Sequence, residues 1–372
     1  MNKPLILVMA AAGRTGAVTV RDLLKRGFPV RAFVRQEDAR SAALKFMGAE
    51  IYVGDMNDYY DLRDAMKGVR RAYHCPPFGL NLLHNAMLFA LAAEEAKLEA
   101  VALMSQWQPH ARHGSFISRE HWIANHIYRW MPSVGVIHIN PGLFAFTYFL
   151  GLPAIVHMGV FMAPYGDGLN APVSNEDIAR VVAAVLADPK DHIGRSYRPS
   201  GPKLISAQDA AACFGEVLGR RVKYQDVPFR MFSKAGVAQG FPLSELAHLR
   251  YYAEDLKSGA FAVGAPTDHV LEVTGQPAEA FDVTAQRYFN DPSLVSLRLK
   301  TGSKASTIAF LIKMMLTKAP DFDAWERNQG YPLLKNAIPS IENEEWRATA
   351  EQQQVNLLPF TRAEMPKILK EA

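Results

Sequence analysis

The sequence predicts an α/β protein built around a doubly wound parallel sheet, followed by a smaller α+β part. Short apolar runs alternate with helical patterns through the first half of the chain. A glycine-containing turn joins the first apolar run to the first helical pattern. Because strands separated by helices pair in parallel and are covered on both faces, these two observations favour a sheet between two layers of helices.

Six strands with five intervening helices are expected before residue 140. The first strand, residues 4–9, is a continuous apolar run, and the helix after it, residues 17–26, ends at Gly27. The other strands are expected at residues 30–34, 50–53, 71–74, 101–104 and 135–139. The other helices are expected at residues 38–47, 58–67, 80–97 and 118–130.

The second half alternates less regularly. It contains helical patterns at residues 175–188 and 206–218, a strand pattern at residues 222–227, and mostly helical patterns from 229 to 290. An apolar helix is expected at residues 306–317. We therefore divide the chain into three parts. Residues 1–150, with elements returning from 170–200, form a nucleotide-binding part. Residues 151–290 form a substrate-binding part, and residues 291–372 form a helical extension of unassigned role.

Charged residues make up 21% of the chain, yet none occurs from Trp130 to Gly166. A membrane-spanning helix needs about 20 consecutive apolar residues. Prolines and polar side chains interrupt this segment, among them Pro141, Pro153 and Asn140, so no membrane span is expected. We interpret the uncharged segment as a buried strand that continues into the wall of a hydrophobic pocket.

The remaining composition excludes several classes of protein. The net charge of +4 is small, and no basic cluster with interleaved aromatic residues supports nucleic-acid binding. The only cysteines, Cys75 and Cys213, cannot form a disulfide framework, and no secretion signal is evident, so we expect a cytoplasmic protein. No metal site is expected, because His121 and His126 are five residues apart and lack a carboxylate partner. His110 and His113 are expected to be solvated.

The turn after the first strand has the pattern A-x-x-G-x-x-G. Ala10 stands where such turns usually begin with glycine, whereas Gly13 allows the backbone to approach a pyrophosphate and Gly16 allows the helix to pack closely on the strand. Amide groups at the start of the following helix attract an anion, and Arg14 and Thr15 lie in the same turn. The turn therefore predicts a dinucleotide site.

The end of the second strand favours NADP over NAD, although NAD remains an alternative. An NAD enzyme usually has a carboxylate there to bind the ribose 2′-hydroxyl, but residues 31–35 contain none. Arg35 and Arg14 are candidates to hold a 2′-phosphate together, unless both are solvated surface residues. After the third strand, Asp55 can accept a hydrogen bond from the adenine amine, cap the next helix, or do both.

These residues resemble the NmrA-like group of atypical short-chain dehydrogenases/reductases over about residues 4–290. The matching segments are A-x-x-G-R-T-G, Val34-Arg35, Gly54-Asp55, Pro76-Pro77, Met104-Ser105, Asn140-Pro141-Gly142, residues 165–179 and residues 217–224. The resemblance implies a Rossmann domain that binds a nicotinamide dinucleotide. The expected cofactor-binding residues are Ala10, Gly13, Arg14, Thr15, Gly16, Arg35, Asp55, Met56, Pro76, Ser105 and Pro141.

The usual catalytic pair of short-chain reductases, Tyr-x-x-x-Lys, is absent. Its spacing falls on Phe116 and Glu120, and no lysine occurs between residues 104 and 154. His121 is the candidate proton donor because an unperturbed imidazole titrates near pH 6.5, although it could instead fix the helix on which it lies. Ser105 is a candidate to hold a substrate oxygen or, alternatively, to cap a turn.

A reductase without this pair suits a substrate that is easily reduced. We expect a hydrophobic, aromatic carbonyl or quinone-like compound, in a pocket lined by Trp107, Phe144 and Tyr148. The alternative is a non-catalytic NAD(P)-binding redox sensor that acts through a protein partner. The apolar helix of the extension must be covered by the same chain, by a second copy in a homodimer or by a membrane surface, and we expect one of the first two.

Overall fold

The computed structural model describes residues 3–294, 302–330 and 333–358. Seven parallel strands form the central sheet in the order β3-β2-β1-β4-β5-β6-β8. The strands are β1 (Leu5–Val8), β2 (Val30–Val34), β3 (Glu50–Val53), β4 (Val69–His74), β5 (Ala100–Met104), β6 (Gly135–Ile139) and β8 (Ser196–Tyr197). All six strands expected in the first half are therefore present, and the doubly wound fold is confirmed.

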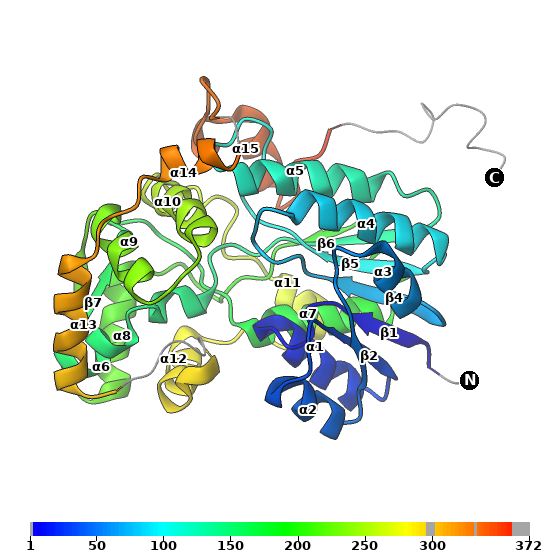
Figure 1. Ribbon diagram of the computed structural model, residues 1–372, viewed down its shortest axis with the longest axis horizontal. Helices are drawn as coiled ribbons and strands as arrows, with labels where there is room; N and C mark the ends of the chain where they lie inside the picture. The colour runs from blue at the N-terminus through cyan, green and yellow to red at the C-terminus, as the bar shows by residue number, and fades with distance from the viewer. Residues whose placement is uncertain (1–2, 295–301, 331–332, 359–372) are drawn as a thin grey trace.

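Helices cover both faces of the sheet (Figure 1). One layer contains α1 (Arg14–Lys25), α2 (Ala39–Phe46), α7 (Asn175–Ala187) and α11 (His269–Thr274). The other contains α3 (Tyr59–Ala65), α4 (Leu82–Glu95) and α5 (Phe116–Arg129). In β1, Ile6 and Val8 face the first layer, while Leu7 faces the second, which explains the continuous apolar run.

The order of the strands reverses between β1 and β4. From β1 the chain moves outward through β2 to β3, and it then returns to β4 on the other side of β1. In open parallel sheets, ligands bind at this switch point, beyond the carboxyl ends of the strands. The site is therefore expected where the turns after β1, β4 and β5 meet.

The smaller part surrounds an aromatic core that includes Phe149, Phe161 and Phe214. Its two parallel strands are β7 (Val160–Ala163) and β9 (Lys223–Asp226). Its helices are η1 (Ala145–Phe149), α6 (Leu152–Met158), α8 (Ala207–Leu218), α9 (Phe229–Ala238), α10 (Leu243–Lys257) and α12 (Phe281–Asn290). The uncharged segment between Trp130 and Gly166 supplies β6, η1, α6 and β7, so its lack of charge follows from burial in both parts.

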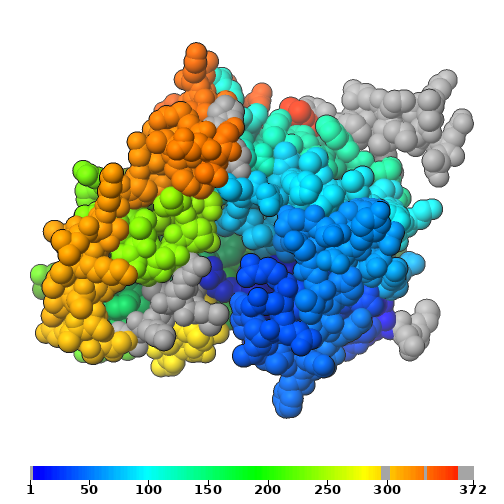
Figure 2. Space-filling view, in the orientation of Figure 1, coloured from blue at the N-terminus to red at the C-terminus, as the bar shows by residue number. Residues whose placement is uncertain are grey.

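The extension covers the outside of this smaller part and then returns to the Rossmann part. Its helices are α13 (Lys304–Leu316), α14 (Phe322–Asn328) and α15 (Glu344–Glu351). In the space-filling view the orange residues of α13 and α14 form a continuous outer strip, and the surface is recessed between the green residues and the blue ones (Figure 2). The expected apolar helix is therefore α13, and one of its sides is covered by the same chain. No helix in the described ranges combines the length and hydropathy that a membrane span requires.

Candidate dinucleotide and substrate site

The turn after β1 is shaped for close approach of the backbone. Ala10 has a φ of +48°, and the amide of Gly13 donates a hydrogen bond to its carbonyl oxygen over 2.8 Å. A Cβ atom at Gly16 would lie under 3.0 Å from the same oxygen, a separation that real Cβ atoms do not tolerate. Glycine is therefore required at Gly16 for α1 to start directly against the turn.

The first turn of α1 has no side-chain cap. Gly13 is the N-cap and supplies no side-chain acceptor, and no acidic residue lies in the first turn. The side chain of Thr15 is bound to the sheet, because the hydroxyl of Tyr73 on β4 lies 3.4 Å from its Oγ1 atom. The uncapped amides and the positive end of the helix dipole suit the pyrophosphate of a dinucleotide.

The two arginines assigned to a 2′-phosphate lie in different surroundings. The guanidinium of Arg14 lies over the ring of Phe146, 4.0 Å from its centre, and burial lowers the pKa of Arg14 while the charge of Glu245 opposes that shift. Arg14 therefore joins α1 to the smaller part. Both residues are nevertheless exposed, Arg14 at the start of α1 and Arg35 at the end of β2. A shared role of Arg14 and Arg35 at a 2′-phosphate therefore stays a prediction.

Asp55 lies after β3 but does not cap the next helix. The N-cap of α3 is Asp58, whose side chain accepts hydrogen bonds from two amides of the first turn. Asp55 instead accepts from the amide and the side chain of Asn57, over 2.8 and 2.9 Å. The capping alternative for Asp55 is therefore wrong. The neighbouring Met56 is half-buried, and its carbonyl oxygen accepts from Asn85.

The turns after β4, β5 and β6 meet at one edge of the sheet because these strands are neighbours. Pro76 and Pro141 are buried in two of these turns. Ser105 is buried in the third, where its amide donates to the carbonyl of Ile139 over 2.8 Å. The Ser105 Oγ atom has no hydrogen-bond partner among the described residues, so it is available to a bound molecule.

His121 lies on α5, the helix that follows the turn after β5. A hydrogen bond over 3.1 Å from Ser118, one turn earlier on α5, to Gln106 ties the helix to the turn after β5. The His121 side chain is 3% exposed, and its Nε2 atom lacks a partner in the part of the chain that the structure describes. Burial lowers the pKa of His121 to about 3. The expectation of an imidazole that titrates near neutral pH is therefore corrected, because His121 is neutral at pH 7.

Comparison with known proteins agrees with this geometry. The sequence model of the NmrA-like family matches residues 2–260. The chain belongs to the NmrA-like family. A (4-alkanoyl-5-oxo-2,5-dihydrofuran-3-yl)methyl phosphate reductase of Streptomyces griseus is 30% identical over 278 residues, which cover 74% of this chain and 95% of the relative. Quinone oxidoreductase 2 of Escherichia coli is 24% identical over 247 residues, which cover 64% and 83%.

Two solved structures share the fold of this NmrA-like protein. The NADPH-dependent quinone oxidoreductase of Escherichia coli, complexed with NADPH, superposes with a TM-score of 0.66 at 22% identity and covers 77% of this chain and 100% of its own. The negative transcriptional regulator NmrA, in complex with NADP, superposes with a TM-score of 0.65 at 16% identity and covers 78% and 96%. The extension from residue 291 lies beyond the match to the NmrA-like family.

This extension holds the loop that follows β5. Trp346 packs its ring edge-on against Trp107, and its Nε1 atom donates to the Trp107 carbonyl over 3.0 Å. The Ser340 amide lies 3.4 Å from a carboxylate oxygen of Asp255, and the other oxygen of Asp255 lies 2.9 Å from His113 Nε2. Residues outside the family match therefore pack against the loop after β5, which begins at the candidate site.

A buried polar network that the sequence did not reveal ties the same loop to α10. His248 lies 2.9 Å from Ser115 Oγ and 3.4 Å from Gln106 Nε2, and burial lowers its pKa well below the usual value. His110 and His113 are both buried, so the expectation that they are solvated is wrong. The only signal in the sequence was the number of histidines in residues 110–126.

The three aromatic residues assigned to a substrate pocket have different neighbours in the structure. Trp107 is buried between Trp346 and the guanidinium of Arg198, which lies 3.5 Å from the centre of its ring. Tyr148 is buried in the aromatic core of the smaller part. Phe144 is half-buried at the junction of the two parts. The shared pocket stays a prediction, and Phe144 is the least buried of the three.

Proposed function

We propose that this NmrA-like protein is an NADP(H)-dependent reductase of a hydrophobic, aromatic carbonyl or quinone-like compound. The observation that carries the proposal is the turn from Ala10 to Gly16, where a Cβ atom at Gly16 has no room and α1 begins without a side-chain cap. These features fit the pyrophosphate of a dinucleotide. The relatives named above, which are reductases of a furanone phosphate and of quinones, support the reaction class.

The preference for NADP over NAD depends on Arg35. Its exposed guanidinium follows β2, which has no carboxylate to meet a ribose 2′-hydroxyl. Arginine binds phosphate through parallel hydrogen bonds, so it favours the dinucleotide that carries a 2′-phosphate. We expect NADPH to bind more tightly than NADH.

The chain must position the acceptor and stabilise its reduced oxygen. A bound nicotinamide dinucleotide would supply the hydride. The candidates to bind the oxygen are Ser105 Oγ and His121 Nε2, both buried and without partners in the described ranges. A neutral imidazole can polarise a carbonyl by donating its N–H group, but it does not act as a general acid with a pKa near 7. In this proposal His121 orients the oxygen, and the proton comes from solvent.

The test has two stages. Calorimetric titration with NADPH and NADH measures binding, and a panel of quinones and aromatic ketones is then screened for oxidation of NADPH. His121→Asn should lower turnover and leave the NADPH affinity unchanged, whereas the matched control His84→Asn, at an exposed position on α4, should change neither. Unchanged turnover in His121→Asn would remove His121 from the proposed mechanism.

The alternative function is a redox sensor that binds NAD(P) and acts through a protein partner. The neutral state of His121 and the missing Tyr-x-x-x-Lys pair favour it, because no residue in the described site is a strong acid catalyst. The solved regulator NmrA, a structural neighbour in complex with NADP, gives a precedent for the fold. Tight NADPH binding without oxidation across the whole panel would decide for the sensor.

A further inference from the structure

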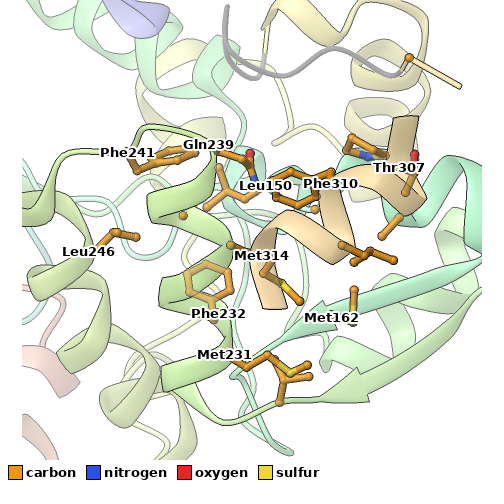
Figure 3. A pocket seen from close by; sticks show the side chains of 18 of the residues that line it. Leu150, Met162, Met231, Phe232, Gln239, Phe241, Leu246, Thr307, Phe310 and Met314 are labelled. Carbon is orange, nitrogen blue, oxygen red and sulfur yellow. The ribbon is translucent and has the colours of Figure 1, made fainter. Parts of the chain in front are cut away.

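A cavity of about 420 Å³ lies beneath α13, in the smaller part of the molecule (Figure 3). Its wall combines side chains of α13, such as Phe310 and Met314, with Phe232 of α9 and with Gln239, which follows α9. Leu150 and Met162, from the uncharged segment, complete it from the side of η1 and β7. Cavities that bind small molecules in proteins are of about 300–1,000 Å³, so this one is large enough for a ligand.

None of the described lining residues carries an ionisable side chain. The wall consists mainly of Leu, Phe, Ala and Met, and methionine adapts its shape to apolar ligands. Ser306 and Thr307 also line the cavity, but their hydroxyl groups already donate to the Ser303 carbonyl over 2.8 and 2.9 Å. Gln239 Oε1 is the exception, because it is buried and has no partner among the described residues.

The helix that closes the cavity is firmly attached. Lys313 of α13 donates to the Ala238 carbonyl at the end of α9 over 3.0 Å, and Lys234 of α9 donates to the Met315 carbonyl at the end of α13 over 2.7 Å. The two helices thus satisfy each other's C-terminal carbonyl groups. These two hydrogen bonds fix the C-terminal end of α13 against α9, so the space beneath the helix, which is partly open to solvent, is a pocket that both helices form.

We propose that this cavity binds a neutral, single-chain amphiphile, with its hydrocarbon chain against the apolar wall and its hydroxyl group donating a hydrogen bond to Gln239 Oε1. An aliphatic carboxylate does not fit, because none of the described lining residues is a cation and burial of an unpaired charge is strongly unfavourable. The site depends on α13, which lies outside the match to the NmrA-like family. No residue assigned to the dinucleotide lines it, so this proposal stands or falls independently of reductase activity.

The experiment uses the full chain and n-dodecanol, which competes with the neutral fluorescent probe N-phenyl-1-naphthylamine. We expect saturable, single-site binding of n-dodecanol, with dodecanoate at least about tenfold weaker at pH 8. Absence of saturable binding would overturn the proposal. Equal affinity for dodecanoate would overturn the ligand class, because no described lining residue supplies a cation for the carboxylate.

Matched variants locate the site. Leu311→Trp fills the cavity and should weaken the binding of n-dodecanol at least about tenfold. The matched control is Ile312→Trp, at a residue of the same helix that is 58% exposed, and it should bind n-dodecanol as the wild type does. Gln239→Met should weaken n-dodecanol about tenfold but leave the affinity for n-dodecane, which has no hydrogen-bond donor, unchanged. Equal n-dodecanol affinity in Leu311→Trp and the wild type would overturn the proposal. Thermal unfolding and NADPH binding report whether each variant is folded, and Ala235→Leu is the milder substitute if Leu311→Trp does not fold.

Discussion

The contact between Trp346 and Trp107 makes a strong prediction about stability. Trp346 is 1% exposed and is the largest fully buried side chain in the described ranges. It packs edge-on against Trp107 with ring centres 6.4 Å apart, and it donates its only N–H group to the Trp107 carbonyl. The substitution Trp346→Ala removes both interactions at once.

The expected loss can be worked out from these contacts. Truncation of a buried tryptophan to alanine lowers the free energy of unfolding by about 3–5 kcal/mol. Trp346→Phe keeps an aromatic ring but loses the hydrogen bond, so the part that depends on the N–H group should be about 1 kcal/mol. The control is Trp130→Ala, at a position that is 55% exposed, for which we expect at most about 0.5 kcal/mol.

Urea unfolding measures the three free energies, and amide hydrogen exchange shows where protection is lost. In Trp346→Ala, exchange should rise in residues 105–115 and 336–358, because each segment covers the other. If Trp346→Ala is no more destabilised than Trp130→Ala, and exchange in residues 105–115 does not change, the extension does not support the β5 loop and the reasoning is refuted.

Three further predictions concern the dinucleotide and the buried histidines. Gly16→Ala should weaken the binding of NADPH at least about 100-fold in a calorimetric titration. The control Gly79→Ala, where an added Cβ meets nothing within 4 Å, should bind NADPH as the wild type does, and equal affinities of the two variants would contradict the role of the turn. Arg35→Ala should abolish the preference for NADPH over NADH, and an unchanged ratio would count against NADP selectivity at β2. Burial lowers the pKa of His121 to about 3, so as the pH falls the imidazole of the unfolded chain is protonated before that of the folded chain. For this group, the free energy of unfolding should therefore fall between about pH 6.5 and 3, by up to about 1.4 kcal/mol per pH unit. His121→Asn should flatten that decline in urea unfolding, and an unchanged slope would exclude His121 as a source of it.

The parallel sheet could be predicted because its signal is local. A strand buried on both faces, such as β1 or β5, must be apolar at successive positions, and this requirement appears directly in the sequence. The turn around Gly16 is equally local, because the close approach involves residues only six positions apart. These features therefore needed no knowledge of the rest of the chain.

The surroundings of the candidate catalytic groups could not be predicted, because they depend on distant segments. His113 lies next to Arg112 in the sequence and looks solvated, but its partner Asp255 is 142 residues away. Tyr148 looks like a residue of a pocket wall, yet rings from β7 and α12 enclose it. The pKa of His121 depends on the same kind of burial, which composition and spacing alone do not report.

The tie between Trp107 and Trp346 also affects how the protein is made. The two residues are 239 positions apart, and ribosomes add about 5–20 residues per second, so the second follows the first by on the order of 10–50 s. During that interval β1 to β6 can already pair, while the loop after β5 lacks its cover. A nascent chain that stops before residue 346 therefore leaves the ribosome with Trp107 and its loop uncovered beside the nucleotide site, a surface that chaperones and proteases recognise.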